Sequence, residues 1–101
     1  TMARSWWQPW RWFKSRHLSG VRIVVYTRQN CPLCQEAETL LQREQERLGF
    51  HLQWVNVDQN QALKALHGDW VPVVEINGEV RFRGQINSVL WQRLMQALAR
   101  R

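Results

Sequence analysis

Two cysteines separated by two residues stand where an apolar, β-branched run gives way to a segment with helical periodicity. Val21–Thr27 predicts a buried strand, and Pro32–Leu48 has apolar residues at helical spacing with charged residues between them. Pro32 suits the first position of a helix, which makes Cys31 the N-cap residue. Free backbone N–H groups and the helix dipole favour a thiolate at that position, and the thiolate is the species that attacks a disulfide. The pattern therefore predicts a reactive sulfur between a strand and a helix.

Cys34 follows one helical turn later, where it can attack a mixed disulfide formed on Cys31 and close a ring. Three other interpretations of the pair stay open. A zinc site needs about four ligands, and the available histidines lack finger-like spacing. A purely structural disulfide across two residues would constrain little of the unfolded chain, and two packing cysteines can fall at this spacing by chance. Thiol–disulfide chemistry fits the pattern best, and it needs no metal and no organic cofactor. The histidines are His17, His51 and His67.

The rest of the chain alternates strands with helices. We expect helices at Gln61–His67 and Asn87–Arg100, and Asn77-Gly78 predicts a two-residue hairpin turn. The order β-α-β-α-β-β-α, with a right-handed crossover at its start, predicts a mixed four-stranded α/β sheet with helices on both faces. Leu52–Asp58 is apolar on both faces and is therefore expected to be a central strand. The expected later strands are Val71–Ile76 and Glu79–Phe82.

Several side chains have an expected environment. His51 and His67 are expected at exposed ends of elements, and Asp58 is expected to cap the connection that follows its strand. The charged residues of the first helix predict a solvated face, and the last helix has an apolar stripe that predicts its inner side. The charged set is Glu36, Glu38, Arg43, Glu44, Glu46 and Arg47, and the stripe is Ile86, Val89, Leu90, Leu94, Ala97 and Leu98.

Three parts of the chain together resemble the glutaredoxins, and most of all the short glutaredoxin-like proteins of bacteria within the thioredoxin-fold superfamily. They are Cys31-Pro32-Leu33-Cys34 after a strand, Trp70-Val71-Pro72-Val73 about forty residues later, and Asn77-Gly78 followed by Gly84. The resemblance covers about residues 21–101. It implies a thioredoxin-like fold with Cys31 as the nucleophile and Cys34 as the resolving thiol.

The resemblance also implies a substrate or glutathione site. Pro72 would be a cis-proline beside the cysteines, and the backbone of Val71 would bind a peptide or glutathione as an added strand does. Arg28 stands where a lysine often meets a carboxylate of glutathione. Trp70 is either packed on the core or part of the substrate rim. The full expected set is Arg28, Pro32, Leu33, Trp70, Val71, Pro72 and Gly84.

The sequence departs from the glutathione pattern of that family at two places. Gly84-Gln85-Ile86-Asn87-Ser88 keeps one glycine but lacks the second glycine and both acids, and Leu33 replaces the usual tyrosine of the cysteine motif. Asn87 or Ser88 can still cap the last helix. Glutathione, as a co-substrate, and thioredoxin reductase or a protein dithiol therefore remain alternative electron donors.

The positive charge of the chain lies in its first third. Of fourteen Lys and Arg, six precede the first acid, Glu36, and eight bases then face eight acids. Residues 1–20 form a basic arm with four of the seven tryptophans, before a domain at residues 21–101. The arm can pack on its own domain, touch a membrane surface through residues 4–16, or bind a protein partner. Nothing in residues 21–101 supports nucleic-acid binding. The arm tryptophans are Trp6, Trp7, Trp10 and Trp12.

The predicted function is a dithiol–disulfide oxidoreductase that reduces disulfides of proteins or small molecules through Cys31 and Cys34. The alternative is a thioredoxin-fold interaction module that its arm recruits to a membrane surface or a protein partner. The sequence has no apolar run long enough to span a membrane and no signal-peptide pattern. A dithiol reductant requires a reducing compartment, so the expected location is the cytoplasm, and peripheral membrane contact is compatible with it.

Overall fold

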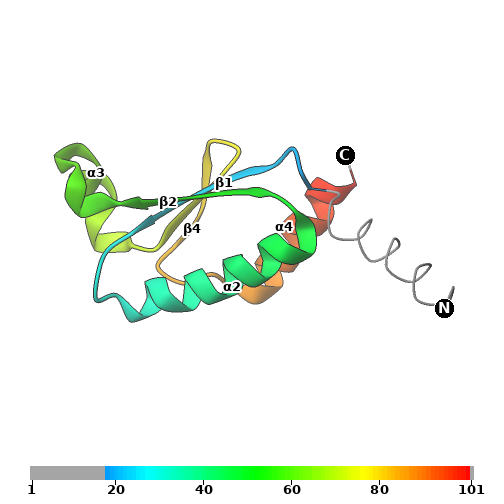
Figure 1. Cartoon of the computed structure of the whole chain (residues 1–101), viewed down its shortest axis with the longest axis horizontal. Coiled ribbons are helices and arrows are strands. Elements are labelled where there is room, and N and C mark those ends of the chain that lie inside the picture. Colours follow the sequence, from blue (N-terminus) through cyan, green and yellow to red (C-terminus); the bar gives the residue numbers. More distant parts are fainter. Residues whose placement is uncertain (1–17, 101) are drawn as a thin grey trace, which may run out of the picture.

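The computed structural model describes residues 18–100 as a four-stranded mixed sheet with helices on both faces (Figure 1). The sheet order is β2-β1-β3-β4; β1 runs parallel to β2 and antiparallel to β3, and β3 runs antiparallel to β4. The predicted order of strands and helices is confirmed. The elements are β1 (Arg22–Thr27), α2 (Pro32–Leu48), β2 (His51–Asn56), α3 (Gln61–His67), β3 (Val73–Ile76), β4 (Glu79–Arg83) and α4 (Ser88–Ala99), with short 3₁₀ turns η1 (Val57–Gln59) and η2 (Gly68–Trp70).

The main core lies between the sheet and the pair α2 and α4, which run beside each other under one face (Figure 1). Alternate residues of the two central strands point into it, as the two-residue period of a strand requires. Helix α3 lies at one end of the opposite face, where its last residue, His67, stacks on Tyr26 of β1 with 4.5 Å between ring centroids. The core residues from these strands are Ile23, Val25, Val74 and Ile76, each with an exposed fraction of 3 % or less.

The strand Leu52–Asp58, expected at the centre of the sheet, is instead the edge strand β2, and none of the β2 residues is fully buried. Its apolar composition was misleading because β3 pairs with the other side of β1 and leaves β2 a single neighbour. The strand also ends earlier, because the Asn56 side chain accepts a hydrogen bond from the N–H of Asp58 and turns the chain into η1. Strand β3 likewise begins at Val73, after η2 and Pro72.

Local sequence signals at turns and helix ends are confirmed. Asn77 and Gly78 both have positive φ, of 51° and 87°, which the two-residue hairpin requires. Gly49 ends α2 in the left-handed region, and its N–H donates to Gln45 O at 2.8 Å. Asn87 caps α4 by accepting from the N–H of Leu90 at 3.0 Å.

The buried face of α4 differs from the expected stripe. Trp91 and Met95 are its buried residues, with Leu94 and Leu98 packed beside them, whereas Val89 and Leu90 are more than half exposed. Positions 91, 94, 95 and 98 follow the i, i+3, i+4, i+7 spacing of one helical face. The large indole of Trp91 decides which face points inward.

Two polar residues expected in solvent are buried. Glu44, placed on the solvated face of α2, is 6 % exposed, and His67 is 5 % exposed beneath Tyr26. Neither position could be assigned from α2 or α3 alone, because the partners lie on α4 and β1. His51, in contrast, is exposed as expected.

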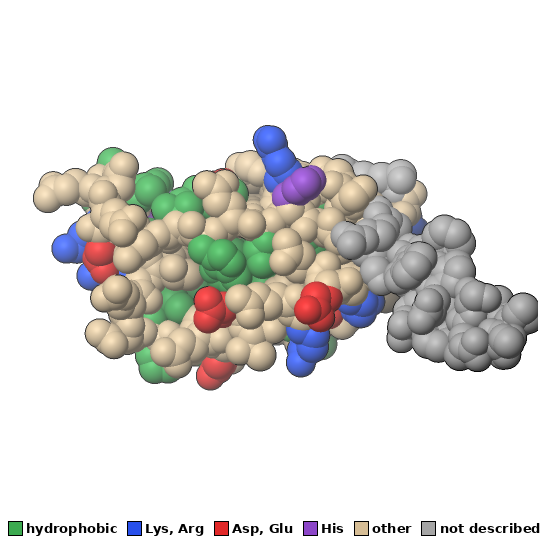
Figure 2. All heavy atoms as spheres, in the orientation of Figure 1, with side chains coloured by type: hydrophobic (Ala, Val, Ile, Leu, Met, Phe, Trp, Pro, Cys, Tyr) green, Lys and Arg blue, Asp and Glu red, His purple; other side chains and the backbone are tan. Residues whose placement is uncertain are grey.

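The predictions for the arm at residues 4–16 and for His17 lie outside the described residues. Leu18, which falls within the 1–20 segment, belongs to the core of the sheet domain: it is 2 % exposed, and its N–H donates to Leu48 O at 3.1 Å. On the face seen in Figure 2, acidic and basic side chains are interspersed. Among residues 18–100, no helix has both the length and the apolar character needed to cross a membrane.

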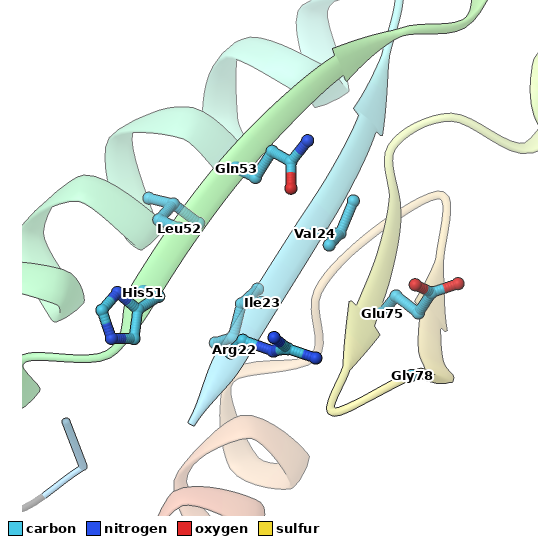
Figure 3. Close-up of a pocket in the computed structure, with 8 residues that line it drawn as sticks. All are labelled: Arg22, Ile23, Val24, His51, Leu52, Gln53, Glu75 and Gly78. Carbon is cyan, nitrogen blue, oxygen red and sulfur yellow. The ribbon is translucent and has the colours of Figure 1, made fainter. Parts of the chain in front are cut away.

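A hollow of about 510 Å³ lies on the sheet face opposite to α2 and α4, around the beginning of β1 (Figure 3). Arg22, Val24, Gln53 and Glu75 point toward it from three neighbouring strands. The cysteines follow the other end of β1, so this hollow is separate from the cysteine pair.

Candidate active site

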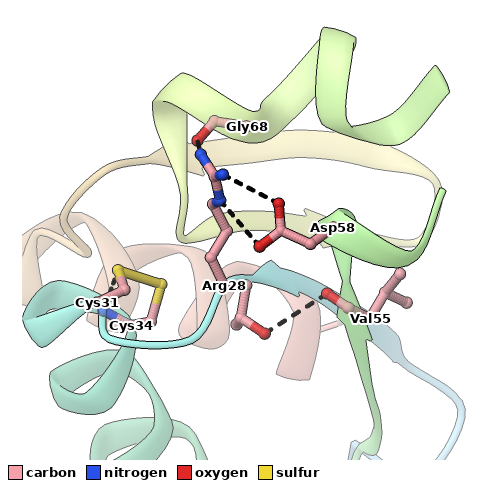
Figure 4. The surroundings of a disulfide bond; sticks show 7 residues. Arg28, Cys31, Cys34, Val55, Asp58 and Gly68 are labelled. Atoms are coloured by element: carbon pink, nitrogen blue, oxygen red, sulfur yellow. Dashed lines mark hydrogen bonds and ion pairs between the residues drawn. A yellow bond between two sulfur atoms is a disulfide. The ribbon is translucent and has the colours of Figure 1, made fainter. Parts of the chain in front are cut away.

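Cys31 and Cys34 form a disulfide at the N-terminus of α2, with their Cα atoms 5.2 Å apart (Figure 4). Cys31 is the N-cap residue: its backbone is extended, and its Sγ accepts a hydrogen bond from the N–H of Cys34 at 3.1 Å. Pro32 occupies the first turn, where a residue without an N–H loses no hydrogen bond. The predicted capping arrangement is confirmed, with Cys34 as the donor.

The two sulfurs differ in access. Cys34 is 5 % exposed, whereas Cys31 is partly exposed. A substrate from solvent can therefore reach Cys31 more easily, while Cys34 stays within bonding reach of it. This asymmetry suits one attacking thiol and one resolving thiol.

A tight turn carries the chain from the central strand β1 into this helix. Asn30 has a positive φ of 56°, in the left-handed region that asparagine tolerates better than most residues. The turn is anchored on one side by β1, which pairs with two strands, and on the other by the capped helix. Cys31, the partly exposed cysteine, is therefore held between a paired strand and a capped helix.

The segment Trp70–Pro72 and Gly84 are hydrogen-bonded to each other. The N–H of Gly84 donates to the carbonyl oxygens of both Trp70 and Pro72, each at 2.9 Å, and Gly84 has a φ of +80°. The Val71–Pro72 peptide bond is cis, as the resemblance implied, and Pro72 is fully buried. Val71 is half-buried with an extended backbone.

The loop after β4 also reaches the cysteine motif. Leu33 lines a small hollow of about 110 Å³ together with Gln85 and Ile86, which directly follow Gly84. Leu33 is 40 % exposed and Trp70 is 59 % exposed. The structure therefore links Leu33, through this loop, with Gly84 and Trp70, and it leaves two large apolar side chains open to solvent.

Arg28 lies near the cysteines in sequence, but its guanidinium is directed toward Asp58 and Gly68 (Figure 4). Its Nη2 contacts one Asp58 carboxylate oxygen at 2.9 Å, its Nε donates to the other at 3.2 Å, and its Nη1 donates to Gly68 O at 3.2 Å. Asp58, expected to cap a connection, instead pairs with Arg28.

The Arg28–Asp58 pair was missed by sequence reasoning, although a signal for it exists. Thr27 and Asn56 are register partners in the parallel strands β1 and β2. The residues just beyond them meet at the same edge of the sheet, so a base after one strand and an acid after the other are placed to pair. This signal can be used only when the register of the two strands is known.

A family model described as a glutaredoxin-like domain (DUF836) matches residues 22–98. The chain belongs to this glutaredoxin-like family. The match spans all the strands and the cysteine motif, so the suspected resemblance is confirmed.

Two solved structures are similar to this glutaredoxin-like chain. One is the solution structure of protein Ne2328 from Nitrosomonas europaea, with 29% sequence identity, a TM-score of 0.64, and coverage of 73% of this chain and 89% of that one. The other is a thioredoxin of Malassezia sympodialis, Mala s 13, with 12% identity, a TM-score of 0.55, and coverage of 92% and 88%. The latter shows the thioredoxin-like fold alone. No curated protein matches the chain.

The family, the fold and the close cysteine pair together support a thiol redox role in general terms. The residues expected around that pair are connected in the structure through Gly84 and the loop that follows it. Arg28 is the member of the expected set whose polar atoms are already occupied by residues of the chain.

Proposed function

We propose that this glutaredoxin-like domain is a dithiol–disulfide oxidoreductase that reduces disulfides of proteins or small molecules. The observation that carries the proposal is the pairing of a partly exposed N-cap sulfur, Cys31, with the buried Cys34 one turn later. Pockets and folds are shared by many functions, but this pair supplies both the nucleophile and the group that resolves its adduct.

The reaction exchanges two electrons between the cysteine pair of the protein and the disulfide of the substrate. In the dithiol form, the Cys31 thiolate attacks one sulfur of the substrate disulfide, a Cys31–substrate disulfide forms, and the other substrate sulfur leaves as a thiolate that takes up a proton. Cys34 then loses its proton and attacks Cys31 Sγ. The second substrate sulfur leaves and is protonated, and the Cys31–Cys34 disulfide remains. Two electrons and two protons have passed to the substrate.

The surrounding backbone supports the first step. In the structure, the N–H of Cys34 already donates to Cys31 Sγ, and the same donor can stabilise a thiolate at that position. We infer that the extended backbone around Val71 and Pro72 receives the substrate chain beside the reacting sulfurs. No metal or organic cofactor is required, because the electrons reside in the sulfur atoms.

A mixed-disulfide trap tests the proposal. Cys34→Ser is expected to accumulate a covalent Cys31–substrate adduct, detected by mass spectrometry and released by dithiothreitol, while Cys31→Ser loses reductase activity. Ser88→Ala, on the first residue of α4, serves as a control that keeps both sulfurs. Activity retained by Cys31→Ser, or an active wild-type protein whose Cys34→Ser variant forms no adduct, contradicts the assigned roles.

The reductant that restores the dithiol is tested by comparing turnover with two electron-donor systems. One contains glutathione and its reductase, and the other contains thioredoxin and thioredoxin reductase. We propose that the protein works in a reducing compartment such as the cytoplasm, since an oxidising one would hold the pair as a disulfide. A reduction potential well below that of the cytosolic thiol pool would argue against this location, because the pool could not then restore the dithiol.

A further inference from the structure

The charge of Arg28 is neutralised within the protein. Three hydrogen bonds or ion-pair contacts, at 2.9, 3.2 and 3.2 Å, join its guanidinium to the Asp58 carboxylate and the Gly68 carbonyl. Both side chains are only about one-third exposed, with exposed fractions of 33% and 37%. A ligand that approaches this end of the molecule therefore meets a neutral pair and not a free cation.

Asp58 is held in place for this contact. Its own N–H donates to Asn56 Oδ1 at 2.9 Å, and the preceding residue, Val57, is fully buried. The caps of the turn and of α3 come from other side chains, those of Asn56 and Asn60. Among the residues that the structure describes, the partner of the Asp58 carboxylate is Arg28.

Gly68 completes the arrangement from the other side. A Cβ at this position would lie 3.6 Å from Arg28 Nη1 and 3.4 Å from the Lys64 side chain, which is ordinary contact distance, so the guanidinium lies directly beside residue 68. Gly68 begins η2, whose last residue is Trp70. Arg28 therefore ties the end of β1 to the segment that presents the exposed indole.

Two large apolar side chains are open to solvent in the cysteine motif and in the segment before the cis-proline. Leu33 lies inside the cysteine motif and is 40 % exposed, and Trp70 precedes the cis-proline and is 59 % exposed. Helix α2 adds acidic charges here: Glu36 lines the hollow beside Leu33, and Glu38 lines the hollow beside Cys34, which the paired Arg28 also lines. These carboxylates disfavour an anionic ligand.

We propose that Asp58 is a specificity-determining residue. By pairing with Arg28, Asp58 prevents that positive charge from binding a ligand. The substrate is then a disulfide in an uncharged, apolar peptide segment that contacts Leu33 and Trp70. Asp58 acts through Arg28 and is thus a positioning residue. The inference rests on the proposed thiol–disulfide exchange and adds the substrate class.

The test compares two disulfide-bonded peptide substrates that differ only in the residue beside the cysteine, leucine in one and glutamate in the other. For the wild-type protein, kcat/KM is expected to be about tenfold higher for the leucine peptide, as one apolar contact allows. Asp58→Asn releases the Arg28 charge, and we expect it to reduce this preference by about fivefold. In the Asp58→Asn/Arg28→Gln double variant, the preference returns toward that of the wild type.

Matched variants separate specificity from general damage. Glu79→Gln breaks the exposed Arg81–Glu79 pair, which has the same 2.9 Å length as the Arg28–Asp58 pair, and it is expected to keep the wild-type preference. Trp70→Ala is expected to lower kcat/KM for the leucine peptide by about tenfold and to change that for the glutamate peptide much less. Added salt should affect the preference of Asp58→Asn more than that of the wild type.

The outcomes distinguish the two proposals. If neither peptide is reduced by any variant, the proposed function fails. If the wild-type protein is active but shows no preference, or if Asp58→Asn leaves the preference unchanged, the inference about Asp58 is overturned while the function stands. Arg83 is the exposed arginine next to Gly84. A large loss of kcat/KM for the glutamate peptide in Arg83→Gln would show that Arg83 binds the substrate carboxylate, and this result would also overturn the inference about Asp58.

Discussion

The carboxylate of Glu44 on α2 accepts a hydrogen bond of 2.8 Å from the indole Nε1 of Trp91 on α4. Arg47, one turn later on α2, donates to both oxygens of the same carboxylate, at 2.8 and 3.1 Å. Glu44 is 6 % exposed and Trp91 is 1 % exposed. The two helices that cover one face of the sheet are thus joined by a polar contact inside an otherwise apolar core.

Trp91→Phe removes the donor and leaves the buried carboxylate with one partner fewer. We expect the free energy of unfolding to fall by about 1.5–3 kcal/mol, the typical contribution of a hydrogen bond to a charged group. Urea denaturation followed by circular dichroism measures the change. Trp70→Phe, at an exposed indole, is the control and should change stability by less than about 0.5 kcal/mol. Equal effects of the two substitutions would show that the hydrogen bond contributes nothing.

The same contact predicts a pH dependence of stability. The hydrogen bonds from Arg47 lower the pKa of Glu44 below its ordinary value of 4.5, and the bond from Trp91 acts in the same direction, although burial opposes them. A lowered pKa in the folded state means that the contribution of Glu44 is complete above its ordinary pKa. It is then lost as the pH falls toward and through the pKa of the folded protein.

Glu44→Gln tests that dependence. The difference in unfolding free energy between wild type and Glu44→Gln is expected to shrink as the pH is lowered from 6 to about 3. Glu46→Gln, at an exposed position on the same helix, should follow the wild-type pH profile. A difference for Glu44→Gln that stays constant over this range would contradict the assigned pKa shift.

Gly84→Ala tests the loop between β4 and α4, which is hydrogen-bonded to the cis-proline segment. A Cβ at residue 84 would meet no atom within 4 Å, so the cost comes from the backbone alone, whose φ is +80°. An L-residue in this region costs about 1–2 kcal/mol. Gly20→Ala is a matched control, because position 20 is equally open and its φ is not in the left-handed region. Thermal unfolding that gave the same loss for both variants would remove conformational strain as the explanation.

The order of strands and helices along the chain and the cysteine geometry could be predicted because their signals are local. The prediction of Cys31 as the N-cap residue rests on the proline that follows it, and the prediction of the hairpin turn rests on Asn77 and Gly78 themselves. The strand–helix–strand start then makes the first two strands a parallel pair with a right-handed crossover. Such features follow from residues that are neighbours in the sequence.

The features that sequence reasoning missed depend on contacts between distant elements. Glu44 was assigned to solvent because its partner Trp91 is 47 positions away, and the Arg28–Asp58 pair needs the register of β1 and β2. His67 is buried with its ring packed against that of Tyr26 on β1. Charged and aromatic side chains have no periodic signal of their own, so their burial is decided by the tertiary structure.

Leu18 offers a test of where the sheet domain begins. Leu18 is 2 % exposed and belongs to the main core. Its N–H donates to Leu48 O at 3.1 Å, and its carbonyl oxygen accepts from the N–H of Val21 at 3.0 Å. Leu18→Ala is therefore expected to lower the free energy of unfolding by about 2–5 kcal/mol, the usual range for a leucine removed from a core.

The matched control is Leu66→Ala, the same chemical change at a leucine of α3 that is 65 % exposed. It should change stability by less than about 0.5 kcal/mol, because little apolar surface returns to water. Both variants are compared by urea denaturation at the same pH. A loss below about 1 kcal/mol for Leu18→Ala would place the start of the core after residue 20, since a buried leucine cannot be truncated at so small a cost.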